Sequence, residues 1–185
     1  MSQQERSTPP AGRARRAPPL DPAALERLAL RYVERFATTR HRLADYLRRK
    51  IRERGWAGEA ADPVALAERM ASLGYVDDRA FAEARAAAMA RRGLGARRVR
   101  GALRQAGIGG EDAEAVDQAI DERQAAAAIA FARRKRIGPF AAAPADRPLR
   151  QKHLAAMLRA GHDFALARTI LSMAPGEDPQ RLVPE

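Results

Sequence analysis

The stretch of sequence that decides the fold is Leu66–Ile108, which reads LAERMASLGYVDDRAFAEARAAAMARRGLGARRVRGALRQAGI. It predicts three consecutive helices with marked ends. The first begins at Pro63 behind Asp62, because proline suits the first position of a helix and an aspartate before it caps free backbone N–H groups. Gly74 ends this helix, since glycine readily takes the left-handed conformation that closes a helix.

The next two helices are bounded in the same way. Either Asp77 or Asp78 caps the second helix, which stops at Gly93. The third helix starts near Gly95 and stops at Gly107. Two acids before a helix are what its N-cap and first turn favour, so a helix cap explains this pair better than a catalytic site does.

The second and third helices carry an unbalanced charge. No Asp or Glu occurs between residues 84 and 110, whereas seven arginines do. They are Arg85, Arg91, Arg92, Arg97, Arg98, Arg100 and Arg104. Arginines without a counter-charge in the sequence need a partner, and the identity of that partner decides the function.

The whole chain is basic and rich in alanine. It has 34 Lys and Arg against 23 Asp and Glu, which gives a net charge of +11. Alanine has the highest helix propensity, so the composition predicts an all-α protein with thin helix interfaces, arranged as an elongated chain of small bundles. The charge favours a polyanionic partner, namely nucleic acid, an anionic membrane surface or an acidic protein. A compositional bias explains why arginine is used in place of lysine, but it does not explain the excess of basic over acidic residues.

Several function classes are excluded by what the sequence lacks. It has no cysteine and hence no thiol nucleophile or Cys-based zinc site. No apolar run is long enough for a membrane span, and no secretory h-region is present, so we expect a cytoplasmic protein. His41, His153 and His162 are scattered, and no HExxH, P-loop or GxGxxG motif occurs. We expect no enzyme, no cofactor and no metal site.

The chain divides into helical segments that end alike. Gly55, Gly107 and Gly161 each follow a basic helix, at a period of roughly 50 residues that is typical of tandem helical arrays. The expected segments are a disordered basic tail (1–20), a first repeat (21–61), a second repeat (62–121), a third repeat (122–174) with a Pro/Ala-rich loop at 138–148, and a frayed tail (175–185).

The third helix of the quoted stretch has two faces. At 100° per residue, Val99 and Leu103 fall on one narrow apolar face. On the opposite side lie Arg97, Arg100 and Arg104, flanked by Arg98. Arginine suits phosphate and carboxylate alike. The start of the helix lacks the Asn, Gln, Ser or Thr of a base-reading helix, so backbone contact is favoured over sequence recognition.

Three short motifs resemble one known family. They are Leu73–Ala82 (LGYVDDRAFA), Gly93–Val99 (GLGARRV) and Leu103–Ile108 (LRQAGI), and their combination resembles the RecX family, the bacterial regulators of the RecA recombinase. The motif positions are Gly74, Tyr75, Asp77, Asp78, Phe81, Leu103 and Gly107. The resemblance covers about residues 25–172 and implies three tandem three-helix repeats in an elongated, curved helical array.

The resemblance also implies a function. Members of the RecX family are non-enzymatic modulators that bind the RecA filament on DNA and usually inhibit its ATP hydrolysis, strand exchange and co-protease activity in recombination, repair and the SOS response. The implied partners of this chain are therefore the RecA-type filament and DNA, single- or double-stranded and without sequence specificity. We expect the chain to bind them as a monomer. The candidate contact residues form a basic face comprising Arg91, Arg92, Arg97, Arg98, Arg100, Arg104, Arg133, Arg134, Lys135, Arg136 and Lys152.

Two other functions remain open at this point. A stand-alone basic helical DNA-binding protein would carry the same arginines, and its affinity for bare DNA would fall steeply with salt. A structural adaptor would carry a basic surface that reflects compositional bias alone. Within the favoured function, the contacts of the arginines with recombinase carboxylates and with DNA phosphates remain alternatives.

Overall fold

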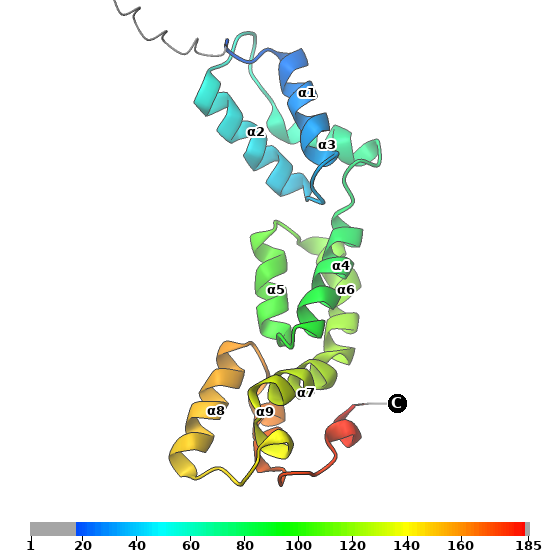
Figure 1. The fold of residues 1–185 in the computed structure, drawn as a ribbon. Helices are drawn as coiled ribbons and strands as arrows, with labels where there is room; N and C mark the ends of the chain where they lie inside the picture. The colour runs from blue at the N-terminus through cyan, green and yellow to red at the C-terminus, as the bar shows by residue number, and fades with distance from the viewer. Residues whose placement is uncertain (1–17, 184–185) are drawn as a thin grey trace, which may run out of the picture.

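The computed structural model describes residues 18–183, and the regular elements of this part of the chain are all helices (Figure 1). The helices are α1 (Pro22–Val33), α2 (Arg40–Arg54), α3 (Pro63–Ser72), α4 (Asp78–Arg91), α5 (Ala96–Gln105), α6 (Gly110–Glu122), α7 (Gln124–Lys135), α8 (Arg147–Arg159) and α9 (Phe164–Ser172), with two 3₁₀ turns, η1 (Gly138–Phe140) and η2 (Pro179–Leu182). Figure 1 shows them stacked into a long array rather than gathered round one centre. The expected all-α fold class is confirmed.

Most of these helices begin where the sequence signals predict. Asp62 accepts hydrogen bonds from two backbone N–H groups of α3, and Pro63 occupies its first position. Asp77 accepts the N–H of Ala80 at 2.8 Å and so caps α4. Thr39 caps α2 in the same manner. These short-range interactions satisfy donors that have no partner within the helix.

Three separate apolar cores divide the array into three-helix units. The first unit is α1–α3, with Leu43, Leu47 and Met70 fully buried. The second unit is α4–α6, whose core is built largely of alanine with Val99, Leu103 and other aliphatic side chains. The third unit is α7–α9. Each core is small, as expected for a chain in which alanine dominates the apolar residues.

This packing differs from one expected boundary. We expected a unit to start at residue 62, but Ala67, Met70 and Val76 belong to the first core, so α3 completes the first unit instead. The chain breaks at Arg123, so that α6 closes the second unit and α7 opens the third.

The expected tails also differ from the structure. Of the tail at 1–20, residues 1–17 lie outside the described residues, but Leu20 is fully buried and its backbone pairs with Gly55 and Ala57. Of the tail at 175–185, the turn η2 folds back so that Leu182 and Val183 pack on the third core. Both ends of the described chain therefore belong to folded units.

Candidate functional site

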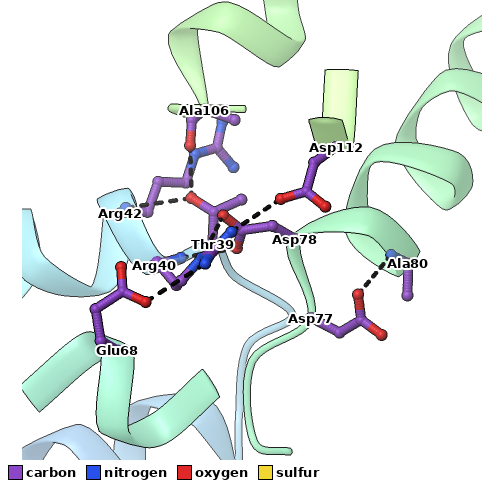
Figure 2. Close-up of polar contacts among 9 residues, drawn as sticks. All are labelled: Thr39, Arg40, Arg42, Glu68, Asp77, Asp78, Ala80, Ala106 and Asp112. Carbon is purple, nitrogen blue, oxygen red and sulfur yellow. Dashed lines mark hydrogen bonds and ion pairs between the residues drawn. The ribbon is translucent and has the colours of Figure 1, made fainter. Parts of the chain in front are cut away.

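The joint between the first and second units is a partly buried polar junction (Figure 2). Thr39 donates its hydroxyl to the carbonyl of Ala106 at 2.5 Å, which ties the start of α2 to the end of α5. Beside it, Arg40 contacts three carboxylates: Asp78 at 3.1 Å, Glu68 at 3.4 Å and Asp112 at 2.8 Å. Asp78 and Glu68 raise the pKa of the Arg40 guanidinium, and the hydrogen bond to Asp78 has the largest effect.

The two adjacent acids of the motif therefore have different roles. Asp77 caps α4, as a helix-cap interpretation requires. Asp78 is buried and accepts both the backbone N–H of Arg40 at 2.9 Å and its side-chain Nε at 3.1 Å. Figure 2 shows Asp78 turned toward Arg40 while Asp77 points toward Ala80. The motif Asp-Asp thus orients the second unit on the first.

The joint between the second and third units is made by close backbone approach. The N–H of Gly95 donates to the carbonyl of Ala160 at 2.9 Å, and that of Arg97 donates to Gly161 at 3.2 Å. His162 is buried here with Nε2 3.2 Å from the carbonyl of Gly93. Burial lowers the pKa of His162, because desolvation disfavours the imidazolium form. These contacts place the end of α8 against the start of α5.

The helix α5 presents the apolar and basic faces that its sequence predicts, with one exception. Val99 and Leu103 are buried, whereas Arg97 and Arg104 are exposed. Arg100, however, forms ion pairs at 2.9 Å with Asp117 and at 3.0 Å with Asp121 of α6. The hydrogen bond that Arg100 donates to Asp117 is the main reason that the pKa of Arg100 is raised. Arg100 is therefore paired within the chain, whereas its sequence alone suggests an arginine without a counter-charge.

Several exposed arginines meet at a hollow between α4, α5 and the end of α8, which we call the central groove. Its volume is about 500 Å³. Five arginines line it, namely Arg85, Arg92, Arg97, Arg98 and Arg159. No acidic residue of the described chain is among its lining residues. Hydrogen bonding to the Leu158 carbonyl holds Arg97 across the joint, so the groove is built from two units at once.

Two of these arginines were not among the residues predicted from sequence. Arg85 lies on α4, and only its place in the acid-free run gave a signal. Arg159 lies in the last turn of α8, far along the chain from the others. It joins them because Gly161 packs against the start of α5, a contact that no local pattern indicates.

The remaining predicted contact residues lie around the groove or away from it. Arg91 is exposed at the end of α4 but does not line the hollow. Arg134 donates to the carbonyl of Arg92, and Arg133 lies 5.1 Å above the ring of Phe140. Exposed side chains of the same basic set are also found at Lys135, Arg136 and Lys152.

The other motif residues have structural positions. Gly107 has a φ of +78°, and a side chain there would collide with His41 of α2. Both the backbone conformation and the lack of space therefore require glycine at this position. Gly74, with φ +80°, makes the turn after α3. Tyr75 is 54% exposed on that turn. Phe81 is partly buried, and Arg42 of the first unit lies 5.3 Å above its ring.

Other kinds of site are not found in the described chain. Among residues 18–183, no cluster of three or more His, Cys, Asp or Glu side chains could hold a metal ion. No described helix is both long and apolar enough to cross a bilayer.

Comparison with known proteins identifies the chain's relatives. A family model described as RecX, second three-helix domain, matches residues 77–116. The regulatory protein RecX of Myxococcus xanthus is 31% identical over 165 residues, which cover 84% of this chain and 88% of that protein. The chain belongs to the RecX family. This confirms the resemblance carried by the three motifs.

Solved RecX structures share the fold. RecX from Lactobacillus salivarius superposes with a TM-score of 0.60 at 20% identity, covering 80% of this chain and 93% of that one. A second structure, of regulatory protein RecX, gives a TM-score of 0.55 at 24% identity and covers 80% and 72% of the two chains. These likenesses confirm the elongated helical array. The segment that matches the RecX model spans α4, α5 and half of α6, and so carries four of the five groove arginines.

Proposed function

We propose that this RecX protein acts as a cytoplasmic monomer that binds the filament of a RecA-type recombinase on DNA. In this proposal it inhibits the ATPase, strand-exchange and co-protease activities of the recombinase, and so regulates recombination, repair and the SOS response. Membership of a family of regulatory proteins supports a regulatory role. The observation that carries the proposal is the central groove, where five arginines meet without an acidic neighbour.

The electrostatics of the groove favour such a partner. Like charges held together repel one another, and an anionic ligand relieves that repulsion. A nucleoprotein filament offers phosphates and acidic side chains within one surface, and arginine forks bind either group through two parallel hydrogen bonds. The guanidinium of Arg100 is already paired with two carboxylates, so we assign the contact to the groove and not to the whole α5 stripe.

The test is the ATP turnover of the cognate recombinase on single-stranded DNA. Wild-type protein added at substoichiometric amounts should lower turnover, because one molecule in a filament affects its neighbours. The variant R85E/R98E/R159E changes one exposed arginine on each of α4, α5 and α8 and should lose the effect with helicity retained.

A matched control carries the same charge change elsewhere. The variant R27E/R147E/R150E replaces three exposed arginines outside the groove, on α1 and at the start of α8. It should inhibit as the wild type does. Equal loss in both variants would mean that net charge acts and not the groove, and no effect of the wild type at equimolar amounts would refute the proposal.

The alternative function is DNA binding without a recombinase. The net charge of +11 favours it. It predicts tight binding of bare DNA, a logarithm of affinity that falls linearly with the logarithm of salt concentration, and unchanged recombinase turnover.

A further inference from the structure

The joint between α5 and α8 borders a second hollow, distinct from the central groove. Its volume is about 430 Å³, and its lining comes from α5, the start of α7, the end of α8 and the start of α9. We call it the α9 hollow. Arg97 and Gly161 line both hollows, so the two meet at the joint, where the start of α5 faces the end of α8 in Figure 1. A partner seated in the central groove therefore also reaches the α9 hollow.

The two hollows lie on different faces of α5. Gly101 and Ala102 line the central groove, whereas Arg100 and Arg104 line the α9 hollow. Arg97 lies between these faces and donates a hydrogen bond to the Leu158 carbonyl at 2.6 Å. One helix thus presents two separate surfaces to a partner.

The α9 hollow has an apolar side. Phe164, at the start of α9, lines it and is 51% exposed. Arg168 lies 5.7 Å above the ring, and half of the phenylalanine stays exposed despite this contact. Leu158 adds a partly buried aliphatic side chain to the same lining. An apolar group from a partner would remove both side chains from water, which is favourable.

The positive charge of the α9 hollow is modest. Arg100 is paired with two carboxylates of α6, and Asp163 of the lining caps α9 with its own carboxylate. Arg104 is exposed, and within residues 18–183 it forms no ion pair. The hollow therefore offers one or two arginines beside an apolar surface, whereas the central groove offers five arginines and no acid.

This combination suits a protein better than a phosphate backbone. Aromatic and arginine side chains are the residues that most often anchor protein–protein interfaces. Phosphates are drawn to the unopposed charge of the central groove, and they offer nothing apolar to Phe164. A neutral apolar segment, in turn, would leave Arg104 without a partner. A carboxylate next to an apolar side chain satisfies both sides of the hollow at once.

We propose that the α9 hollow binds a protein segment in which an acidic and an apolar side chain are neighbours. Arg97 and Arg104 pair with the carboxylate, and Phe164 and Leu158 cover the apolar group. The identity of the partner rests on the proposed function, since the segment would belong to the recombinase of the same filament. The chemistry of the site involves this chain alone, so it can be measured with a peptide.

The first experiment compares two peptides of equal charge. A fluorescent decapeptide of alternating Asp and Leu and one of alternating Asp and Ala are titrated with the full chain by anisotropy. The leucine peptide should bind about tenfold more tightly, because burial of part of the larger side chain contributes that factor. Equal affinities for the two peptides would overturn the inference.

Variants locate the contact. F164A should remove the preference for the leucine peptide without changing the affinity for the alanine peptide, and F164L should keep most of the preference. R104E should weaken both peptides equally, because the carboxylates are common to them. The matched control is F36A, which removes a phenylalanine that is 56% exposed in the first unit and should change neither. An unchanged preference in F164A, or an equal loss in F36A, would overturn the site.

The partner is tested with the intact filament. In co-sedimentation with recombinase on single-stranded DNA, F164A should bind about tenfold more weakly than wild type, while its affinity for the bare DNA stays the same. An equal loss on bare DNA would mean that Phe164 contacts nucleic acid, and filament binding like that of wild type would mean that the segment is not on the recombinase; either result overturns the inference. A wild type that selects the leucine peptide but does not bind the filament would refute the proposed function and support the site.

Discussion

The sharpest structural prediction concerns the joint between the first two units. Asp78 sits at the start of α4 with only 6% of its side chain exposed, and it accepts two hydrogen bonds from Arg40. In the substitution D78N the size of the side chain stays the same, but its charge is removed. The single amide oxygen can accept only one of the two donors, and the amide nitrogen then faces the other.

The expected loss follows from this geometry. A hydrogen bond between charged groups contributes about 1.5–3 kcal/mol. Arg40 is 38% exposed and keeps Glu68 and Asp112, so the loss should lie near the lower end, at about 2 kcal/mol. For a chain of this size that corresponds to a fall in Tm of about 4–8 °C.

The adjacent residue is the control. D77N makes the same chemical change at the N-cap of α4, where Asn and Asp are about equally good. Thermal unfolding followed by circular dichroism should therefore leave D77N close to wild type and D78N well below it. The reasoning is refuted if the two variants melt together. A double-mutant cycle with R40Q should give a coupling of about 1–2 kcal/mol.

Three further predictions follow from the joints and the groove. G95A places a Cβ 2.3 Å from the backbone of Gly161 and should lower Tm, because it pushes the third unit away from the second. G101A has open space around it and should raise the free energy of unfolding by about 1 kcal/mol. The opposite order of the two melting temperatures would contradict the packing. Burial lowers the pKa of His162 below its unfolded value, so the unfolded chain takes up the proton at a higher pH than the folded chain does. Stability should therefore fall as the pH drops below about 6.5. H162Q should show a flatter pH dependence of Tm, and parallel profiles for variant and wild type would argue against this origin. R100Q should cost about 1 kcal/mol of stability and leave filament binding near wild type, as measured by melting and co-sedimentation. R98Q should leave stability near wild type and weaken filament binding. A larger binding loss in R100Q than in R98Q would mean that Arg100 belongs to the contact surface.

The helices were predictable because their signals are local. Asp62 followed by Pro63, and glycine at positions 74 and 107, act on backbone groups within a few residues. Such signals can be recognised in a sequence without knowing what the helix packs against. The apolar face of α5 was predictable for the same reason, since Val99 and Leu103 follow helical periodicity.

The grouping of helices into units was harder to predict. α3 follows a linker and precedes the motif, so its position in the sequence suggests the second unit. Its buried side chains, Ala67 and Met70, pack instead on α1 and α2. A helical periodicity shows which face is buried but not which partner buries it.

The candidate site was predicted only in part, because its charges are paired across long sequence distances. The acid-free run correctly marks α4 and α5 as the basic elements, but it hides the fact that Arg100 meets Asp117 and Asp121 of α6. It also cannot indicate Arg159, which the backbone contacts of Gly95 with the α8–α9 turn bring into the groove. These are tertiary facts with no local pattern.

The most direct test of the central claim is one ATPase comparison. The cognate recombinase on single-stranded DNA is titrated with wild-type protein and, in parallel, with R85E/R98E/R159E. Our account predicts reduced turnover at substoichiometric wild type and none with the variant at the same helicity. Turnover that stays unchanged with equimolar wild type, or falls equally with both proteins, would contradict it.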